Sequence, residues 1–278
     1  MKIIQIIRKH KWIHKPISLF FHYFIYPFKE GYYRFMINYV IRIKKNEILQ
    51  LEEYGFKSIK PFKSRSWRIG TEKDKAYRRY YTADFDNKTC FIKVAINDLT
   101  IGNEISIAQK LINKKLPFVP EIICFDKNML GMKQMLATEF TRGLHPISKE
   151  SVYNDVPTVS SSELLDYCCQ MNDILESLES INLVHGDIHK GNLMLDGNNK
   201  LCLLDFGISK FINIPNDVNY KFRPGTYYQE TKDGRVYDDA YSFIRLINRY
   251  ESVNEIRDSE CYKKIESRIG KMQFCVNI

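Results

Sequence analysis

Apolar and polar positions alternate along residues 76–85, and a polar turn and an apolar run follow. The alternating stretch, Ala76–Phe85, is rich in tyrosine, which suits the half-buried face of a strand. Asp86 and Asn87 are turn-forming residues, and the apolar run Thr89–Ala95 comes next with Lys93 inside it. We therefore predict a strand hairpin.

The apolar period then becomes that of a helix over Ile101–Leu116. Apolar side chains recur at helical spacing, and Pro117 ends the pattern; these positions are Ile101, Ile105, Ala108, Leu111 and Ile112. The predicted helix carries Glu104. Glu121–Phe125 and Met132–Phe140 follow as two strand candidates.

A polar linker, Thr141-Arg142-Gly143, marks a predicted boundary between two lobes. Beyond it, Ser160 and Glu163 have the spacing of a capping box, ahead of apolar positions at helical spacing: Leu164, Leu165, Cys168, Met171, Leu175 and Leu178. This pattern predicts a helix of about five turns. Residues 208–236 contain prolines and glycines and are predicted to be irregular, and 239–250 are predicted to be helical.

A second hairpin is predicted between two polar positions. The apolar runs Leu193–Leu195 and Leu201–Leu204 are joined by the turn-forming residues 196–200. Because a hairpin returns the chain to its starting edge, Asn192 and Asp205 are expected to lie close together.

These positions suit phosphoryl transfer, together with Asp187 in the run His185-Gly-Asp-Ile-His-Lys-Gly-Asn192. Such transfer needs a carboxylate beside the attacking hydroxyl and oxygen ligands for Mg²⁺ on the nucleotide. Asp187 fits the first task, and Asn192 and Asp205 fit the second. A polar turn with a chance Asp-Phe-Gly is the alternative, but the joint spacing makes coincidence a poor explanation.

Composition sets broad limits. The chain has 278 residues, and 44% hydrophobic with 27% charged residues is ordinary for a globular protein of one or two domains. Seven cysteines form no CxxC pair and mostly lie in apolar runs, so we expect them to be reduced core residues of a cytoplasmic protein. The first residues are not typical of a secretory signal.

The net charge of +9 comes almost entirely from residues 1–60, which hold 12 Lys and Arg against 4 Asp and Glu. Aromatic residues are interspersed there, a mixture that suits an anionic lipid surface. The longest uncharged run, Pro16–Phe28, has 13 residues, fewer than the ~20 of a spanning helix. A helical extension packed on the body, with its lysines in solvent, is an equal alternative. No nucleic-acid partner is expected, because nothing downstream resembles a base-reading module.

The motifs resemble the protein kinase-like superfamily. That superfamily places Asn five residues after its catalytic Asp and Asp-Phe-Gly thirteen residues later, as Asp187, Asn192 and Asp205 are placed here. The resemblance implies that Lys93 holds the α and β phosphates of ATP and that Glu104 is its ion-pair partner. A solvent-facing strand lysine and a helix-surface glutamate are the simpler alternatives.

Three further positions follow from the same resemblance. Leu136–Gly143, which includes Glu139, resembles the hinge whose backbone binds adenine. Gly70 is what remains of the glycine-rich phosphate loop. Asp239 resembles the buried Asp that braces the catalytic loop, although a plain helix N-cap is the other interpretation.

Departures from the protein kinase pattern show which group within the superfamily the chain resembles most. Gly186 and His189 stand where protein kinases have Arg and Lys, and no Ala-Pro-Glu follows Asp-Phe-Gly. The pattern His-Gly-Asp-x-His-x-x-Asn is similar to that of sugar kinases, and with the basic N-terminus most similar to bacterial lipopolysaccharide core heptose and Kdo kinases. His185 and His189 are expected to hydrogen-bond within the loop rather than to act as bases.

The resemblance implies an α+β, bilobal protein kinase-like fold with a basic extension at 1–58, a β-rich N-lobe at 59–143 and a shortened helical C-lobe at 144–278. The implied activity uses ATP and Mg²⁺ to phosphorylate a sugar hydroxyl of a membrane glycolipid at the inner face of the cytoplasmic membrane. A Ser/Thr protein kinase and a catalytically inactive scaffold are the alternatives.

Overall fold

The structure, a computed structural model, describes residues 47–62, 77–96, 98–129, 133–147, 159–212, 227–232 and 234–276. The chain divides into two compact units, residues 1–59 and 60–278. Helix α4 (Glu47–Glu53) lies in the first unit, and strand β1 (Lys57–Pro61) crosses from the first unit to the second.

An antiparallel sheet forms the first part of the second unit. Its strands follow the order β2 (Tyr77–Phe85), β3 (Lys88–Ile96), β5 (Lys133–Glu139), β4 (Ile122–Met129). Asp86 and Asn87 take φ values of +46° and +63°, the backbone that a tight two-residue hairpin requires. The predicted hairpin and both later strands are confirmed.

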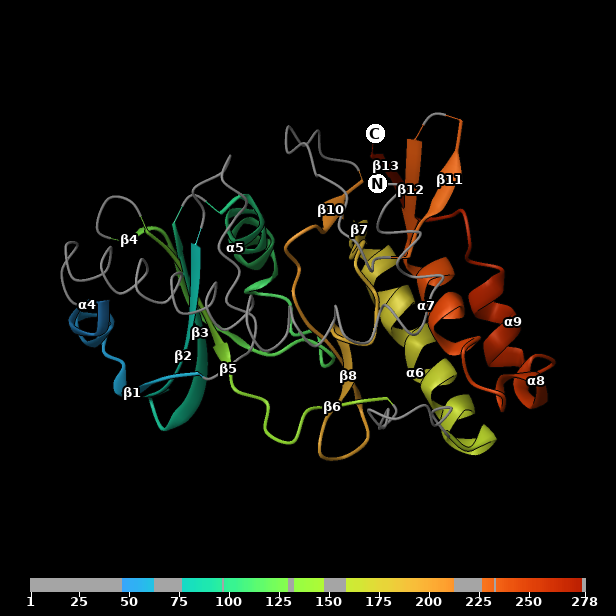
Figure 1. The fold of residues 1–278 in the computed structure, drawn as a ribbon, viewed down its shortest axis with the longest axis horizontal. Helices are drawn as coiled ribbons and strands as arrows, with labels where there is room; N and C mark the ends of the chain where they lie inside the picture. The colour runs from blue at the N-terminus through green and yellow to red at the C-terminus, as the bar shows by residue number, and fades with distance from the viewer. Residues whose placement is uncertain are drawn as a thin grey trace, which may run out of the picture. The chain divides into compact units, whose positions relative to one another are not determined.

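Helix α5 (Leu99–Leu111) packs beside this sheet (Figure 1). Asp98 caps its first turn by accepting hydrogen bonds from the backbone of Thr100 and Ile101. The helix ends five residues before the predicted end at Leu116. Its buried face stops at Leu111, since Ile112 is 44% exposed, so further helical turns would bury no apolar surface.

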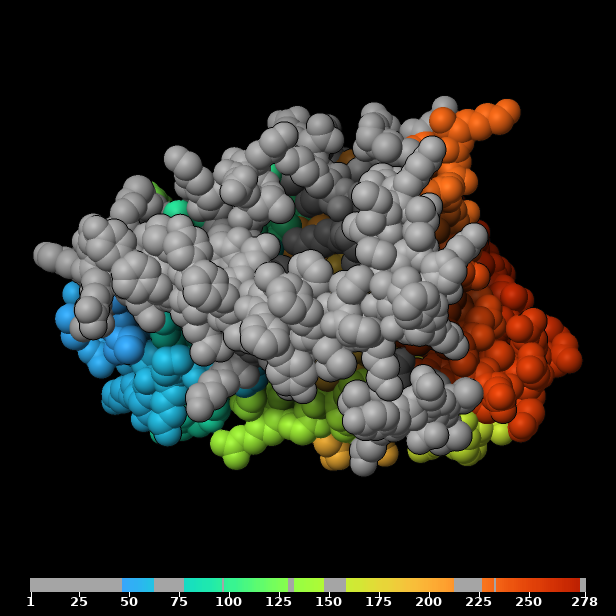
Figure 2. All heavy atoms as spheres, viewed as in Figure 1, coloured from blue at the N-terminus to red at the C-terminus, as the bar shows by residue number. Residues whose placement is uncertain are grey.

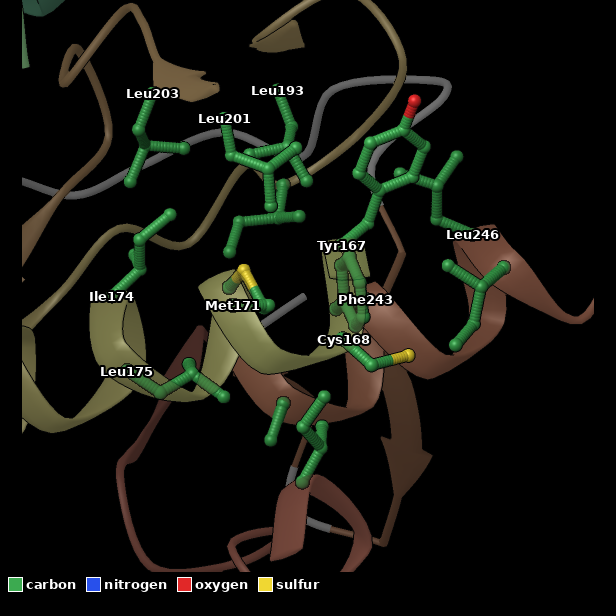
Figure 3. Close-up of a cluster of buried hydrophobic side chains, with 14 of the residues drawn as sticks. Tyr167, Cys168, Met171, Ile174, Leu175, Leu193, Leu201, Leu203, Phe243 and Leu246 are labelled. Atoms are coloured by element: carbon green, nitrogen blue, oxygen red, sulfur yellow. The ribbon is translucent and has the colours of Figure 1, made fainter. Parts of the chain in front are cut away.

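A helical core forms the other part of the second unit. Helix α6 (Ser161–Ser180) begins with the predicted capping box, and α7 (Asp239–Ile247), α8 (Val253–Ile256) and α9 (Glu260–Glu266) follow later in the chain. Side chains of α6 such as Met171 meet the leucines of the second hairpin and Phe243 of α7 (Figure 3). In the space-filling view, α8 and α9 lie at the right-hand surface (Figure 2).

Short strands complete the unit in three small sheets. The second hairpin is present as β8 (Leu193–Leu195) and β9 (Leu201–Leu203), with β6 (His145–Pro146) beside β8. The other two sheets pair β7 with β10, and β11 with β12 and β13; their strands are β7 (Leu183–Val184), β10 (Lys210–Phe211), β11 (Gln229–Thr231), β12 (Gly234–Asp238) and β13 (Gln273–Val276).

Residues 208–236 were therefore predicted wrongly where the structure describes them, because they contain β10, β11 and the start of β12. Strands of two or three residues carry too little alternation to be recognised from sequence. They form because neighbouring segments offer backbone hydrogen bonds.

The prediction that all cysteines are reduced is also wrong. Cys169 of α6 and Cys261 of α9 form a disulfide across 92 residues of sequence. The packing of the two helices brings these side chains together, and sequence spacing gives no sign of it. Cys90, Cys168 and Cys202 are buried thiols, as expected.

No helix among the described residues has both the length and the apolar composition needed to cross a membrane. The basic aromatic segment at 1–46 lies outside the described residues, so the lipid-surface prediction for it stays a prediction.

Candidate active site

A cleft of about 530 Å³ lies between the sheet with α5 and the β8–β9 hairpin. Strand β3 contributes Lys93 to its lining, α5 contributes Glu104, and the hairpin ends contribute Asn192 and Asp205. Apolar side chains supply much of the remaining wall, among them Leu136, Met194 and Leu203. An apolar cleft with a few convergent polar groups is the usual form of a small-ligand site.

Lys93 and Glu104 form a buried ion pair in this cleft. The Lys93 Nζ atom lies 2.7 and 2.8 Å from the two carboxylate oxygens of Glu104 and 3.9 Å from Asp205 Oδ1. Burial by itself lowers the pKa of Lys93, but the two carboxylates outweigh burial, so this pKa is raised and the amine is charged. The predicted pairing is therefore present, and neither side chain is solvated on the surface.

Asn192 lines the cleft, and Asp187, which does not line it, is bonded directly to Asn192. The Asn192 Nδ2 atom donates to both the carbonyl oxygen and the carboxylate Oδ2 of Asp187, each at 3.1 Å. Both residues are buried. Since the amide nitrogen is used in this way, the amide oxygen is the atom of Asn192 that suits a metal ion.

The catalytic-loop histidines hydrogen-bond within the loop, as predicted. His185 Nδ1 accepts from the backbone N–H of Asp187 at 3.2 Å, so its Nε2 carries the proton and donates to the Leu204 carbonyl at 3.0 Å. Burial lowers the pKa of His185 to about 4, which keeps the ring neutral. His189 Nδ1 accepts from Gly191 N–H at 2.9 Å, and its Nε2 lies 3.6 Å from Asp187 Oδ1.

Asp239 braces the same loop from α7. Its two carboxylate oxygens accept the backbone N–H groups of His185 at 2.7 Å and Gly186 at 2.8 Å. Burial raises the pKa of Asp239 to about 7, even though these two hydrogen bonds favour the charged form. Asp238 is the N-cap of α7, accepting from Tyr241 N–H, so the N-cap interpretation of Asp239 is wrong.

The second hairpin brings Asn192 and Asp205 together, as predicted. The Leu204 N–H donates to the Asn192 carbonyl at 2.8 Å, which places Asp205 next to the end of β8. Asp205 takes a φ of +59°, an uncommon conformation for a non-glycine residue, and both side chains line the cleft. Two hard oxygen donors at a cleft edge fit Mg²⁺, which takes one or two protein ligands and completes its shell with phosphate oxygens and water.

The structure gives a steric reason for glycine at position 186, and the sequence alone does not reveal it. Its φ is +78°, and a Cβ atom there would lie 2.9 Å from Cζ of Phe274 in β13. The Phe274 ring stacks on Tyr237 and packs with Val184 and Ile208. Strand β13 therefore occupies the space beside Gly186. Protein kinases, which the loop resembles, have Arg at the position of Gly186.

Arg78 supports the site from β2, and no motif in the sequence points to it. It is buried on β2 and bonds both Asp98, the N-cap of α5, and the Thr100 hydroxyl. Its signal in the sequence was faint, since an arginine in an alternating strand is usually on the exposed face. Here it ties the sheet to the start of the helix that carries Glu104.

The structure gives less support to the other residues predicted to bind the nucleotide. Glu139 lines the cleft, but its backbone N–H donates to the Glu121 carbonyl at 2.8 Å, so a hydrogen bond to adenine through that group has a competitor. Thr141 and Gly143 of the same hinge also line the cleft. Gly70 lies outside the described residues.

Part of the chain is similar to known kinase-like proteins. Residues 104–222 match the ABC1 atypical kinase-like domain. The chain is 26% identical over 152 residues to a probable serine/threonine-protein kinase of Dictyostelium discoideum, covering 49% of this chain and 9% of that protein. It is 34% identical over 76 residues to the serine/threonine-protein kinase PKH1 of Saccharomyces cerevisiae, covering 27% of this chain and 8% of that protein.

Among solved structures, the kinase PK-1 of the Cydia pomonella granulovirus matches with a TM-score of 0.43 and 15% identity, over 59% of this chain and 58% of that one. The chain spans under a tenth of the length of both curated relatives named above. The stretch matched by the ABC1 description includes Asp187, Asn192 and Asp205. The match to the ABC1 atypical kinase-like description and the similarity to the curated kinases show that the protein is kinase-like. Its fold is mixed α+β, with a small sheet-rich part ahead of the helical core.

Proposed function

We propose that this protein is an ATP- and Mg²⁺-dependent phosphotransferase that phosphorylates a sugar hydroxyl of a membrane glycolipid. The observation that carries the phosphotransferase part is the convergence of Lys93, Asn192 and Asp205 on one cleft, with Asp187 bonded to Asn192. Phosphoryl transfer depends on positioning and on electrostatic stabilisation, and these side chains supply both.

Each residue has a distinct task in this proposal. Asp187 orients the acceptor hydroxyl and takes its proton, since its carboxylate is held in place by the Asn192 amide. Lys93 binds the α and β phosphates, and Glu104 keeps its amine in the cleft. Asn192 and Asp205 hold Mg²⁺, which would neutralise charge on the phosphate oxygens.

The glycolipid acceptor is supported by the sequence. Gly186 and His189 give the loop the pattern of sugar kinases, and residues 1–60 combine aromatic side chains with an excess of positive charge. We place the protein in the cytoplasm and at the inner face of the cytoplasmic membrane, where ATP and a lipid-linked sugar are both present.

A Ser/Thr protein kinase is the second candidate. Of the two curated relatives named above, one is a serine/threonine-protein kinase and the other is named a probable one, which favours a protein acceptor. Against it, Gly186 stands at the position where regulated protein kinases have the arginine that docks a phosphorylated activation loop. Phe274 fills the space beside Gly186.

Transfer of labelled phosphate from ATP separates these candidates. The protein is incubated with purified core glycolipid, with a protein extract, or with neither, and label is measured in the lipid and protein fractions. We expect label in the lipid fraction only. Label confined to protein would replace the glycolipid proposal by the second candidate, and no label in any fraction would support an inactive scaffold.

Asp187→Asn tests the phosphotransferase assignment itself. Removal of the proton acceptor is expected to lower transfer by at least a hundredfold, the usual worth of a general base, while MgATP still binds. Asp173→Asn is the matched control, because Asp173 is an exposed carboxylate on α6. Equal turnover in both variants would disprove the role of Asp187.

A further inference from the structure

Asn103 of α5 lies one residue before Glu104 and faces the loop that carries Asp205. Its Nδ2 atom is 2.9 Å from the Ser209 carbonyl, 3.3 Å from the Gly207 carbonyl and 3.4 Å from the Phe206 carbonyl. Asn103 is buried, with 6% of the residue exposed. One buried amide thus lies within hydrogen-bond distance of three carbonyl oxygens of this loop, all more than a hundred residues away in sequence.

Two other contacts join α5 to the same loop. A Cβ atom on Gly207 would lie 3.1 Å from the Thr100 Cβ, so the backbone of the loop approaches the first turn of the helix closely. At the other end, Lys110 Nζ lies 4.7 Å from the centre of the Phe211 ring. We call this contact, from Thr100 to Lys110 on the helix and from Phe206 to Phe211 on the loop, the α5–loop seam.

The seam joins the two halves of the candidate phosphate site. Glu104 on the helix holds Lys93, and the loop carries Asp205, whose Oδ1 is 3.9 Å from the Lys93 amine. A sliding of α5 along the loop would separate these charges. Asn103 is the buried polar group of the seam that has directional bonds to the loop backbone, so it fixes the relative position of helix and loop.

We propose that Asn103 is a positioning residue for the metal and phosphate site, which holds Asp205 in register with Lys93 and Glu104. This inference rests on the proposed function, because it assigns a task to the site that binds MgATP. Neither the motifs nor the matched families point to Asn103. A neutral amide is needed there, since three carbonyl oxygens repel a carboxylate and an aliphatic side chain removes the donor that they share. The Phe206 carbonyl would keep the backbone N–H of Ser209, at 3.2 Å.

Asn103→Asp and Asn103→Ala test the proposal by MgATP binding at different concentrations of free Mg²⁺, measured by calorimetry. When Mg²⁺ is limiting, we expect the Kd for MgATP to rise about tenfold in both variants, a loss of ~1.4 kcal/mol. The loss should shrink when Mg²⁺ is saturating. Lowering the pH should partly restore binding in Asn103→Asp only, because a protonated carboxyl can again donate to a carbonyl.

Asn172→Asp is the matched control. Asn172 is also buried, and its Nδ2 donates to the carbonyls of Cys168 at 3.2 Å and Cys261 at 2.7 Å, within the helical core. We expect this variant to lose stability but to keep the Kd for MgATP, and its dependence on Mg²⁺, within twofold of the native values. An equal shift in all three variants, or a native Mg²⁺ dependence in both Asn103 variants, would overturn the proposal.

Hydrogen exchange separates this inference from the proposed function. In the protein without nucleotide, the amides of Gly207 and Ser209 should exchange at least tenfold faster in Asn103→Ala than in the native chain or in Asn172→Asp. Unchanged exchange would show that Asn103 does not hold the loop. If exchange rises but the native chain binds no MgATP, the seam exists, whereas both its catalytic purpose and the proposed function fail.

Discussion

The two sides of the cleft hold their charged groups by different means. On the sheet side, Lys93 is held by opposite charge, through the buried carboxylate of Glu104. On the loop side, Asp187 is held by the amide of Asn192, within a loop whose backbone is bonded to Asp239. The sheet side therefore depends on charge balance, and the loop side depends on the geometry of the backbone.

Breaking the charge balance should have the largest effect on stability. Glu104→Gln leaves the buried Lys93 amine with a weaker partner, and we expect a loss of about 3 kcal/mol in the free energy of unfolding, measured by denaturant titration. The double variant Lys93→Met with Glu104→Leu removes both charges and should recover most of that loss. Equal losses in the single and double variants would show that the ion pair is not what matters.

Distorting the loop backbone should cost slightly less. Gly186→Ala adds a Cβ atom 2.9 Å from the Phe274 ring at a φ of +78°, and we expect a loss of about 2 kcal/mol together with reduced transfer activity. Phe274→Ala in the same chain should relieve the contact but not the backbone strain. Gly197→Ala is the control, since nothing lies within 4 Å of its added Cβ.

The pH dependence of stability gives a finer test of the loop. Burial raises the pKa of Asp239 from 3.8 to about 7, so between these values the folded chain binds more protons than the unfolded chain, and stability falls as pH rises. Burial lowers the pKa of His185 from 6.5 to about 4, so its contribution makes stability rise over that interval. The two contributions largely cancel between about pH 4 and 6.5.

Asp239→Asn removes the first contribution and should expose the second. Between pH 4 and 6.5, the slope of stability against pH is then expected to be more positive in the variant than in the native chain, by up to ~1.4 kcal/mol per pH unit. Equal slopes in the two chains would show that burial does not raise the pKa of Asp239.

The smallest effect should come from a site that belongs to neither side of the cleft. Ser160→Ala removes the N-cap of α6, and we expect a loss of about 1 kcal/mol with unchanged transfer activity. A loss of activity equal to that of Gly186→Ala would mean that transfer follows overall stability, not the loop geometry.

Much of the fold could be predicted because its elements carry local signals. The hairpins at 77–96 and 193–203 combine apolar runs with turn-forming residues. The start of α6 is indicated by the capping box of Ser160 and Glu163. The helix end at Leu111 could not be predicted from the apolar period, because Ile112 follows the period but finds no core to contact.

The candidate site could be predicted for the same reason, whereas features that depend on distant segments could not. Asp187, Asn192 and Asp205 lie within nineteen residues, so their spacing alone indicated a shared edge. The disulfide between Cys169 and Cys261, and the β-strands within 208–236, depend on which segments lie side by side.

By itself, the sequence determined the kinase-like motifs and the elements that carry them, because motif spacing and hydrophobic period are local properties of the chain. Only the tertiary structure decided what holds those motifs in place: Asn103 on the loop after Asp205, Asp239 on the loop before Asp187, and Phe274 against Gly186. Each of these contacts joins residues more than fifty positions apart, and the packing of helices and strands alone brings them within reach.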